Sequence, residues 1–131
     1  MAKWNYSYNS GHAKATLLLN GRKFIGEAHL HPEDVSIESQ RSGYTLAEMR
    51  AGIKVLQHHI QNELKPALKA LKHLNCCIQQ SKSYNPKSYE ARMLTRNLRL
   101  LDEELQDCKG ELNILKDQYH AYLNALNNRR P

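Results

Sequence analysis

Polar and apolar residues alternate near the start of the chain and then recur at helical spacing over the rest of it. Between residues 4 and 8, three aromatic side chains alternate with polar ones, and this period of two predicts a strand. Two further apolar runs, 13–19 and 23–30, flank Asn20 and Gly21, which suit the positive φ angles of a tight hairpin turn. The pattern therefore predicts a small antiparallel sheet of two or three strands.

The segment after these runs is predicted to connect the sheet to a helix. Pro32 removes a ladder donor and holds His31 extended, so the sheet should end there. Residues 35–44 are predicted to form a linker with a short edge strand. Thr45 and Glu48 have the spacing of a capping box, in which the threonine accepts a bond from a free N–H and the glutamate reaches back. The first helix is therefore predicted to begin at Thr45.

The first helix is predicted over residues 45–80. Apolar residues recur in steps of three and four, and the one irregular step, from Ile60 to Leu64, is a stutter that locally unwinds a supercoil. Pro66 lies beside it and lacks an N–H, so the pattern predicts a kink near residues 62–66 and no chain break. The apolar positions are Leu46, Met49, Ile53, Leu56, Ile60, Leu64, Ala67, Leu71, Leu74 and Ile78.

The second helix is predicted over residues 86–127, after a turn at 81–85. Asn85 is the expected N-cap, with Pro86 at the first helical position. An apolar seam alternates strictly in steps of four and three, which is typical of a coiled-coil heptad. The seam is Leu94, Leu98, Leu101, Leu105, Cys108, Leu112, Leu115, Tyr119, Tyr122 and Leu126.

These elements predict an α+β fold with two regions. Residues 1–44 form the sheet region, and residues 45–131 form a long antiparallel helical hairpin, because a short turn makes two helices neighbours. Two helices alone leave each seam half covered. Self-association would cover it, so we predict a homodimer.

Composition narrows the environment in which the protein works. Of the 131 residues three are cysteines, and this odd number, with Cys76 and Cys77 adjacent and Cys108 apart, favours reduced thiols over disulfides. The N-terminus has no apolar signal-peptide core, and no run approaches the length of a membrane span. The sequence therefore predicts a soluble protein in the cytoplasm of the cell that makes it.

Positive charge is concentrated in the middle of the chain. The formal net charge is +6, yet residues 64–100 alone carry eight basic residues and one acid, Glu90, so the remainder of the chain sums to −1. In an antiparallel hairpin this charge gathers at the end near the turn, where Tyr84 and Tyr89 also lie. The predicted partner-binding residues are Lys65, Lys69, Lys72, Lys82, Tyr84, Lys87, Tyr89, Arg92, Arg96 and Arg99.

Such a basic surface suits DNA, RNA or an acidic protein surface, and the tyrosines suit stacking on a base or filling a partner's pocket. The alternative is an ordinary solvated face that is balanced by the acidic residues 102–107 of another subunit. Binding driven by phosphate contacts would weaken steeply with salt, so a binding constant that is unchanged between low and moderate salt would count against nucleic acid.

The sequence predicts no catalytic residue and no cofactor. A nucleophilic enzyme needs a nucleophile, a base and an oxyanion donor together, and no motif of that kind occurs. Asp102, Glu103, Glu104 and Asp107 lie off the seam, as expected for a solvated helix face.

Two groups of residues have metal-ligand spacing, but the prediction is that neither binds a metal. His29 and His31 share one face of a strand, with Glu33 and Asp34 following and His12 near in the hairpin, yet polar residues at a strand end explain the same pattern. On the first helix, His73, Cys76 and Cys77 share a face but lack a local fourth ligand. The cysteines are interpreted as small buried residues.

Three blocks carry a resemblance that spans nearly the whole chain: residues 26–34 (GEAHLHPED), 43–54 (GYTLAEMRAGIK) and 81–91 (SKSYNPKSYEA). They resemble small proteins from phages and integrative elements of Gram-positive bacteria such as streptococci. His29 stands here in place of a cysteine of that group, which weakens any ligand role at this position.

The resemblance implies a non-enzymatic inhibitor of host defence, acting in the cytoplasm of a bacterial host. An anti-CRISPR protein that blocks an RNA-guided Cas nuclease is the leading expectation, with the nuclease or its ribonucleoprotein as partner. One alternative is a DNA- or RNA-binding accessory protein of the mobile element. Another is a sponge for a nucleotide immune signal, with an anion pocket formed by Arg50, Lys54 and the sheet.

Overall fold

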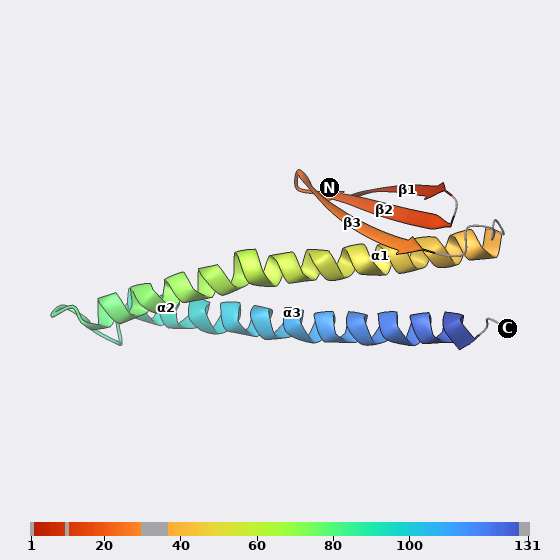
Figure 1. Cartoon of the computed structure of the whole chain (residues 1–131). Coiled ribbons are helices and arrows are strands. Elements are labelled where there is room, and N and C mark those ends of the chain that lie inside the picture. Colours follow the sequence, from red (N-terminus) through yellow and green to blue (C-terminus); the bar gives the residue numbers. More distant parts are fainter. Residues whose placement is uncertain (1, 10, 30–36, 129–131) are drawn as a thin grey trace. The chain divides into compact units, whose positions relative to one another are not determined.

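The computed structural model describes residues 2–9, 11–29 and 37–128. It has an α+β fold, in which a three-stranded antiparallel sheet at the N-terminus is followed by helices (Figure 1). The elements are β1 (Lys3–Asn9), β2 (His12–Leu19), β3 (Arg22–His29), α1 (Ile37–His59), the π-helical turn η1 (Ile60–Leu64), α2 (Lys65–Gln79) and α3 (Tyr89–Asn128).

The chain divides into two compact units. Unit 1 comprises residues 1–57 and 112–131, and therefore contains the sheet, most of α1 and the C-terminal part of α3. Unit 2 comprises residues 58–111, with η1, α2 and the N-terminal part of α3. Each unit is a distinct packing environment.

The predicted sheet is confirmed, with three strands in the order β1-β2-β3. The β2–β3 turn places Asn20 at φ 51° and Gly21 at φ 79°, the two left-handed positions that a tight hairpin requires. The pairing of Leu19 with Arg22 fixes the register directly beside that turn. The Asn-Gly pair therefore sets both the turn and the pairing of the two strands.

One face of the sheet packs on α1 in unit 1. Several of its inward residues are small: Ala13 and Ala15 are fully buried on β2, and Gly26 is buried on β3. A Cβ added to Gly26 would meet the carbonyl oxygen of Ala47 and lie 2.6 Å from the backbone nitrogen of Ala51. Strand and helix backbones therefore approach each other closely, as only glycine permits at this position.

Two basic side chains of α1, Arg50 and Lys54, donate hydrogen bonds to the backbone of β3. β3 is an edge strand, and two of its carbonyls accept hydrogen bonds from α1: Lys54 Nζ donates to the oxygen of Ile25 at 2.6 Å, and Arg50 donates to the oxygen of Glu27. Arg50 Nε also donates to the hydroxyl of the buried Tyr119 on α3, at 2.6 Å. These bonds satisfy part of the open strand edge and join three elements of unit 1.

The predicted linker is wrong for residues 37–44, because α1 already begins at Ile37. The predicted capping box is wrong as well. Thr45 lies inside the helix, and its hydroxyl donates to the carbonyl oxygen of Arg41, one turn earlier, at 2.9 Å. The predictions for residues 30–36, including the proline that ends the sheet, fall outside the described residues.

Packing against β1 stabilises α1 at Tyr44, the last residue of the predicted linker. The ring of Tyr44 meets the edges or faces of Tyr6 and Tyr8, with ring centroids 5.3 and 6.1 Å apart. Glu48, one turn further on, accepts a hydrogen bond from the Tyr6 hydroxyl and so has no capping role. These cross-element contacts stabilise a helical turn that local sequence preference did not indicate.

The Tyr6–Glu48 bond predicts a loss of stability at alkaline pH. The hydrogen bond to Glu48, together with desolvation and the glutamate's charge, raises the pKa of Tyr6 to about 12, from 10.0. A phenol whose pKa is raised on folding stabilises the protein fully below pH 10.0, and this contribution disappears as pH rises toward 12. In urea denaturation at several pH values, Tyr6→Phe should lose less stability over this window than the wild type. Tyr89→Phe, at a position that is 66 % exposed, is the control and should follow the wild type; equal losses in Tyr6→Phe would contradict the assignment.

The prediction of an irregular but unbroken first helix is confirmed. Residues 37–79 are helical throughout, and η1 forms a π-helical turn directly before Pro66. A wider turn avoids the clash between the proline ring and a preceding carbonyl. It also rotates the residues that follow, so Leu68 is buried while Ala67, a predicted seam position, is exposed. Assigning Ala67 to the seam was wrong for this reason.

The turn after α2 ends later than predicted. α3 begins at Tyr89, and its N-cap is Ser88, whose hydroxyl oxygen accepts from the nitrogen of Ala91 at 3.2 Å. The predicted cap, Asn85, instead accepts from the nitrogen of Lys87 at 3.0 Å, and its carbonyl oxygen accepts from the nitrogen of Ser88. Proline after an asparagine starts a β-turn as readily as a helix, and here the turn is formed.

The predicted helix of the second arm is confirmed as one uninterrupted helix, α3. Every position of its predicted seam is buried or half-buried, with Leu105 and Tyr119 the most buried. Apolar residues off the seam, such as Leu100 and Ile114, are 46 % and 59 % exposed. The four-three spacing therefore identified the packed face of α3 correctly.

Candidate functional site

Two stripes of basic residues lie on the helices of unit 2. Each stripe has the spacing i, i+4, i+7, which places its three side chains on one helix face. All six side chains are exposed. We name them the α2 stripe, which is Lys65, Lys69 and Lys72, and the α3 stripe, which is Arg92, Arg96 and Arg99. The remaining predicted bases, Lys82 and Lys87, are exposed in the segment between α2 and α3.

Almost none of this charge is neutralised within the described part of the chain. Of the eight predicted bases, Arg99 alone forms an ion pair there, with Glu103 at 3.9 Å on the solvated surface. Like charges one helical turn apart repel each other by a few tenths of a kcal/mol per pair. Binding of an anionic group to a stripe would relieve this repulsion.

The α2 stripe borders a shallow hollow of about 240 Å³. Its three lysines surround an apolar floor that is formed by Leu68 on α2 and Leu105 on α3, both buried. An apolar wall beside three cations concentrates their field, because less water screens it. The sequence predicted the lysines and the buried position of Leu105, but it missed Leu68, because Ala67 was assigned to the seam in its place.

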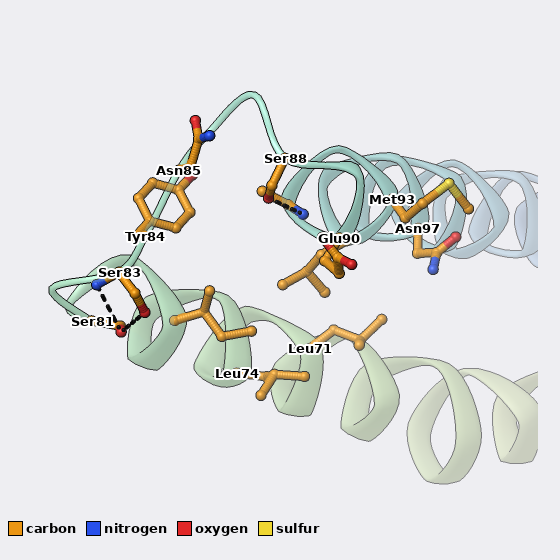
Figure 2. A pocket seen from close by; sticks show the side chains of 13 residues that line it. Leu71, Leu74, Ser81, Ser83, Tyr84, Asn85, Ser88, Glu90, Met93 and Asn97 are labelled. Atoms are coloured by element: carbon orange, nitrogen blue, oxygen red, sulfur yellow. Dashed lines mark hydrogen bonds between the residues drawn. The ribbon is translucent and has the colours of Figure 1, made fainter.

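A second, apolar cavity of about 460 Å³ lies beside the turn between α2 and α3 (Figure 2). Leu71 and Leu74 line it from α2, Met93 and Asn97 line it from α3, and Tyr84 lines it from the turn. Leu74 is 47 % exposed, because the helices do not close over it. The apolar periodicity predicted Leu71 and Leu74 as packed seam residues. In the structure both line this cavity beside the turn between α2 and α3.

The two predicted aromatic residues have different surroundings. Tyr84 is half-buried against the apolar cavity, and its nitrogen donates to the carbonyl oxygen of Ser81 at 3.1 Å. Tyr89, the first residue of α3, is 66 % exposed. Tyr89 therefore presents an open ring for stacking, whereas Tyr84 is part of the cavity wall.

The acidic residues of unit 2 form pairs mainly with histidines. Glu104 lies 3.8 Å from His59, the last residue of α1, and His59 Nδ1 lies 2.9 Å from Glu63. Glu63 also lies 3.8 Å from His58. Within the described residues, the acidic segment 102–107 thus neutralises one base of the stripes, Arg99, and no other.

The cysteines on α2 are exposed, so their interpretation as buried filler is wrong for both Cys76 and Cys77. Cys77 Sγ lies 3.7 Å from His73 Nε2, one turn away. Cys108 is half-buried in the α3 seam; its burial, together with neighbouring carboxylates, raises the pKa of its thiol. A raised pKa keeps this thiol protonated and poorly nucleophilic at neutral pH.

Of the strand-end residues with metal-ligand spacing, His12 and His29 are brought together across β2 and β3. His31, Glu33 and Asp34 lie outside the described residues. Glu27, which the spacing did not single out, lies beside His12. It was missed because the pattern along one strand does not reveal a neighbour on the next strand.

Comparisons with models of protein families, with curated proteins and with solved structures find no match. Within the described residues, none of the helices combines the length and the apolarity that crossing a membrane requires.

Proposed function

We propose that this protein is a non-enzymatic binding protein that engages a polyanionic partner through the α2 and α3 stripes. The observation that carries the proposal is the set of unneutralised bases in unit 2, three of which surround a hollow with an apolar floor. Phosphates of a nucleic acid are the polyanion best suited to such stripes, since each lysine or arginine that contacts one releases a counterion. The apolar floor adds contact area for a sugar or a base.

We further propose that α1, η1 and α2 pair with α3 as one long antiparallel hairpin. Contacts within each unit support this arrangement. In unit 1, Arg50 of α1 bonds to Tyr119 of α3, and in unit 2, His59 of α1 pairs with Glu104 of α3. The later residue of α1 therefore contacts the earlier residue of α3, as expected for antiparallel helices. The half-buried seam of α3 leaves apolar surface for a second copy, and homodimer formation stays a prediction.

As the partner we propose the ribonucleoprotein of an RNA-guided Cas nuclease, so that the protein acts as an anti-CRISPR inhibitor in a bacterial host. The three sequence blocks with a phage-protein resemblance motivate this choice. The third block, residues 81–91, contains the turn between α2 and α3, with both basic turn residues and Tyr84. Guide RNA or target DNA held by the nuclease supplies the phosphates that the stripes require.

The direct test is cleavage of target DNA by a purified, guide-loaded Cas nuclease in the presence of excess protein. We expect inhibition by the wild type, and its loss when Lys65, Lys69 and Lys72 are all replaced with glutamine. A control with Lys3, Arg22 and Lys23 replaced loses the same charge from the exposed surface of the sheet and should still inhibit. Unchanged cleavage at a large molar excess of wild-type protein would reject the nuclease as partner.

A nucleic-acid-binding accessory protein of the mobile element is the second candidate, because the same stripes favour it. It predicts binding to free DNA or RNA without any effect on the nuclease. A sponge for a nucleotide signal has less support. Arg50 and Lys54, the cations of its expected pocket, already donate hydrogen bonds to carbonyls of β3.

A further inference from the structure

Three potential metal ligands meet on the face of the sheet that points away from α1. His12 on β2 is directly opposite His29 on β3, and Glu27 precedes His29 by two residues, so all three share this face. The alanines between them, Ala13 and Ala28, are buried on the other face. The register of the hairpin, which the Asn20–Gly21 turn sets, thus brings two imidazoles and one carboxylate together.

The side chains of His12, Glu27 and His29 lie close together. The rings of His12 and His29 are parallel, with an interplanar angle of 3° and centroids 4.5 Å apart. One ligand atom from each of the three residues lies within 4.8 Å of the others, and His12 Nε2 lies 3.4 Å from Glu27 Oε1. Metal–ligand bonds of about 2.0 to 2.2 Å would need only small side-chain rotations to converge on one ion.

A polar atom without a partner lies within this group. His12 Nε2 is shielded from solvent and has no hydrogen-bond partner among the described residues, although Glu27 approaches it. A shielded polar atom without a partner is costly and needs a physical explanation. A metal ion between the nitrogen and the carboxylate would supply its missing bond.

The arrangement of Glu27 also favours a metal over an ordinary surface ion pair. Lys14 is the residue directly opposite Glu27 on β2, and a lysine–glutamate pair would be the expected cross-strand contact. Among the described residues, the ion pair of Glu27 is with His12, and Lys14 takes no part in one. The carboxylate therefore lies with the imidazoles.

We propose that His12, Glu27 and His29 form a binding site for Zn²⁺ or a similar divalent transition metal. Two imidazole nitrogens and one carboxylate oxygen suit zinc, whereas Mg²⁺ and Ca²⁺ prefer oxygen ligands alone. Three protein ligands leave a fourth position for water. The ion would bridge β2 and β3 in unit 1, whereas the basic stripes belong to unit 2.

The test is titration of the full-length protein with Zn²⁺ by calorimetry, together with the visible absorption of bound Co²⁺. We expect one site, and a rise of the melting temperature with added Zn²⁺, since an ion that binds only the folded protein stabilises it. His12→Ala and His29→Ala should each weaken binding by about 100-fold, at least as much as loss of an outer-shell partner does. Thr16→Ala, on the same face of β2 four residues from His12, is the matched control and should bind normally.

Glu27→Gln is a second variant, which should fold normally because it keeps the size of an exposed side chain. It should retain the sheet by circular dichroism while binding Zn²⁺ more weakly. The exposed pair of His73 and Cys77 is the competing site, and thiolate ligation there would add a strong charge-transfer band in the near ultraviolet to the Co²⁺ spectrum. Absence of Zn²⁺ binding, undiminished binding when both His12 and His29 are replaced, or a spectrum dominated by that band would overturn the proposal.

Discussion

Replacing Lys65, Lys69 and Lys72 with glutamine is expected to weaken binding to a short DNA duplex by about 100-fold in ~0.1 M salt. The three lysines share one face of α2, surround the hollow above Leu68 and Leu105, and form no ion pair among the described residues. Each phosphate contact contributes about 0.9 to the slope of log affinity against log salt, so three contacts together give an effect of this size. Fluorescence anisotropy over a range of salt concentrations measures both quantities.

The salt dependence separates specific contacts from bulk charge. The triple variant should lower the slope by about three, one for each phosphate contact removed. Replacing Lys3, Arg22 and Lys23 changes the net charge equally but leaves the stripes intact, so its slope should match the wild type. If both triple variants lose affinity equally, or if wild-type binding does not respond to salt, the α2 stripe is not a phosphate-binding surface. Inhibition of the nuclease without any nucleic-acid binding would instead point to an acidic protein surface.

Gly26→Ala is expected to lower the free energy of unfolding by about 3 kcal/mol. The new methyl group would collide with the carbonyl of Ala47 and lie 2.6 Å from the nitrogen of Ala51, both of which are backbone atoms of α1. Neither can move without displacing the helix from the sheet. That displacement would also break the bonds from Arg50 and Lys54 to β3. Urea denaturation followed by circular dichroism measures the change.

Gly110→Ala is the matched control for this substitution. A Cβ at Gly110 meets nothing within 4 Å, and the residue lies on an exposed face inside α3. The same glycine-to-alanine change should therefore raise stability by up to about 1 kcal/mol, because alanine favours helix. Equal small effects at both positions would show that the sheet does not approach α1 as closely as the backbone distances indicate.

Some elements of this fold follow from local rules in the sequence, and others depend on tertiary packing. The Asn20–Gly21 turn and the four-three spacing of α3 were predicted correctly, because each depends on a local rule: positive φ angles in one case and helical periodicity in the other. The stutter beside Pro66 likewise appears as the π-helical turn η1. In all three places, residues close in the sequence decide the structure.

The errors occur where a tertiary contact outweighs a local preference. Thr45 and Glu48 match a capping box at a helix start. However, Tyr44 packs on the ring of Tyr6 in β1, and Thr45 lies inside a helix that begins before it. Asn85 and Pro86 match a helix start, but the chain uses them in a β-turn and begins α3 after Ser88. Local patterns state what a segment is able to form, and the free energy of packing selects among those options.

The candidate sites show the same division. The sequence by itself determined that the middle of the chain is strongly basic, that His12 and His29 occur in a hairpin, and that one face of each helix is apolar. Only the tertiary structure decided that the α2 stripe surrounds an apolar floor and that Glu27 joins the histidines. It also decided that Arg50 and Lys54 are bound to β3, because proximity between strands and helices depends on register and packing that no local spacing encodes.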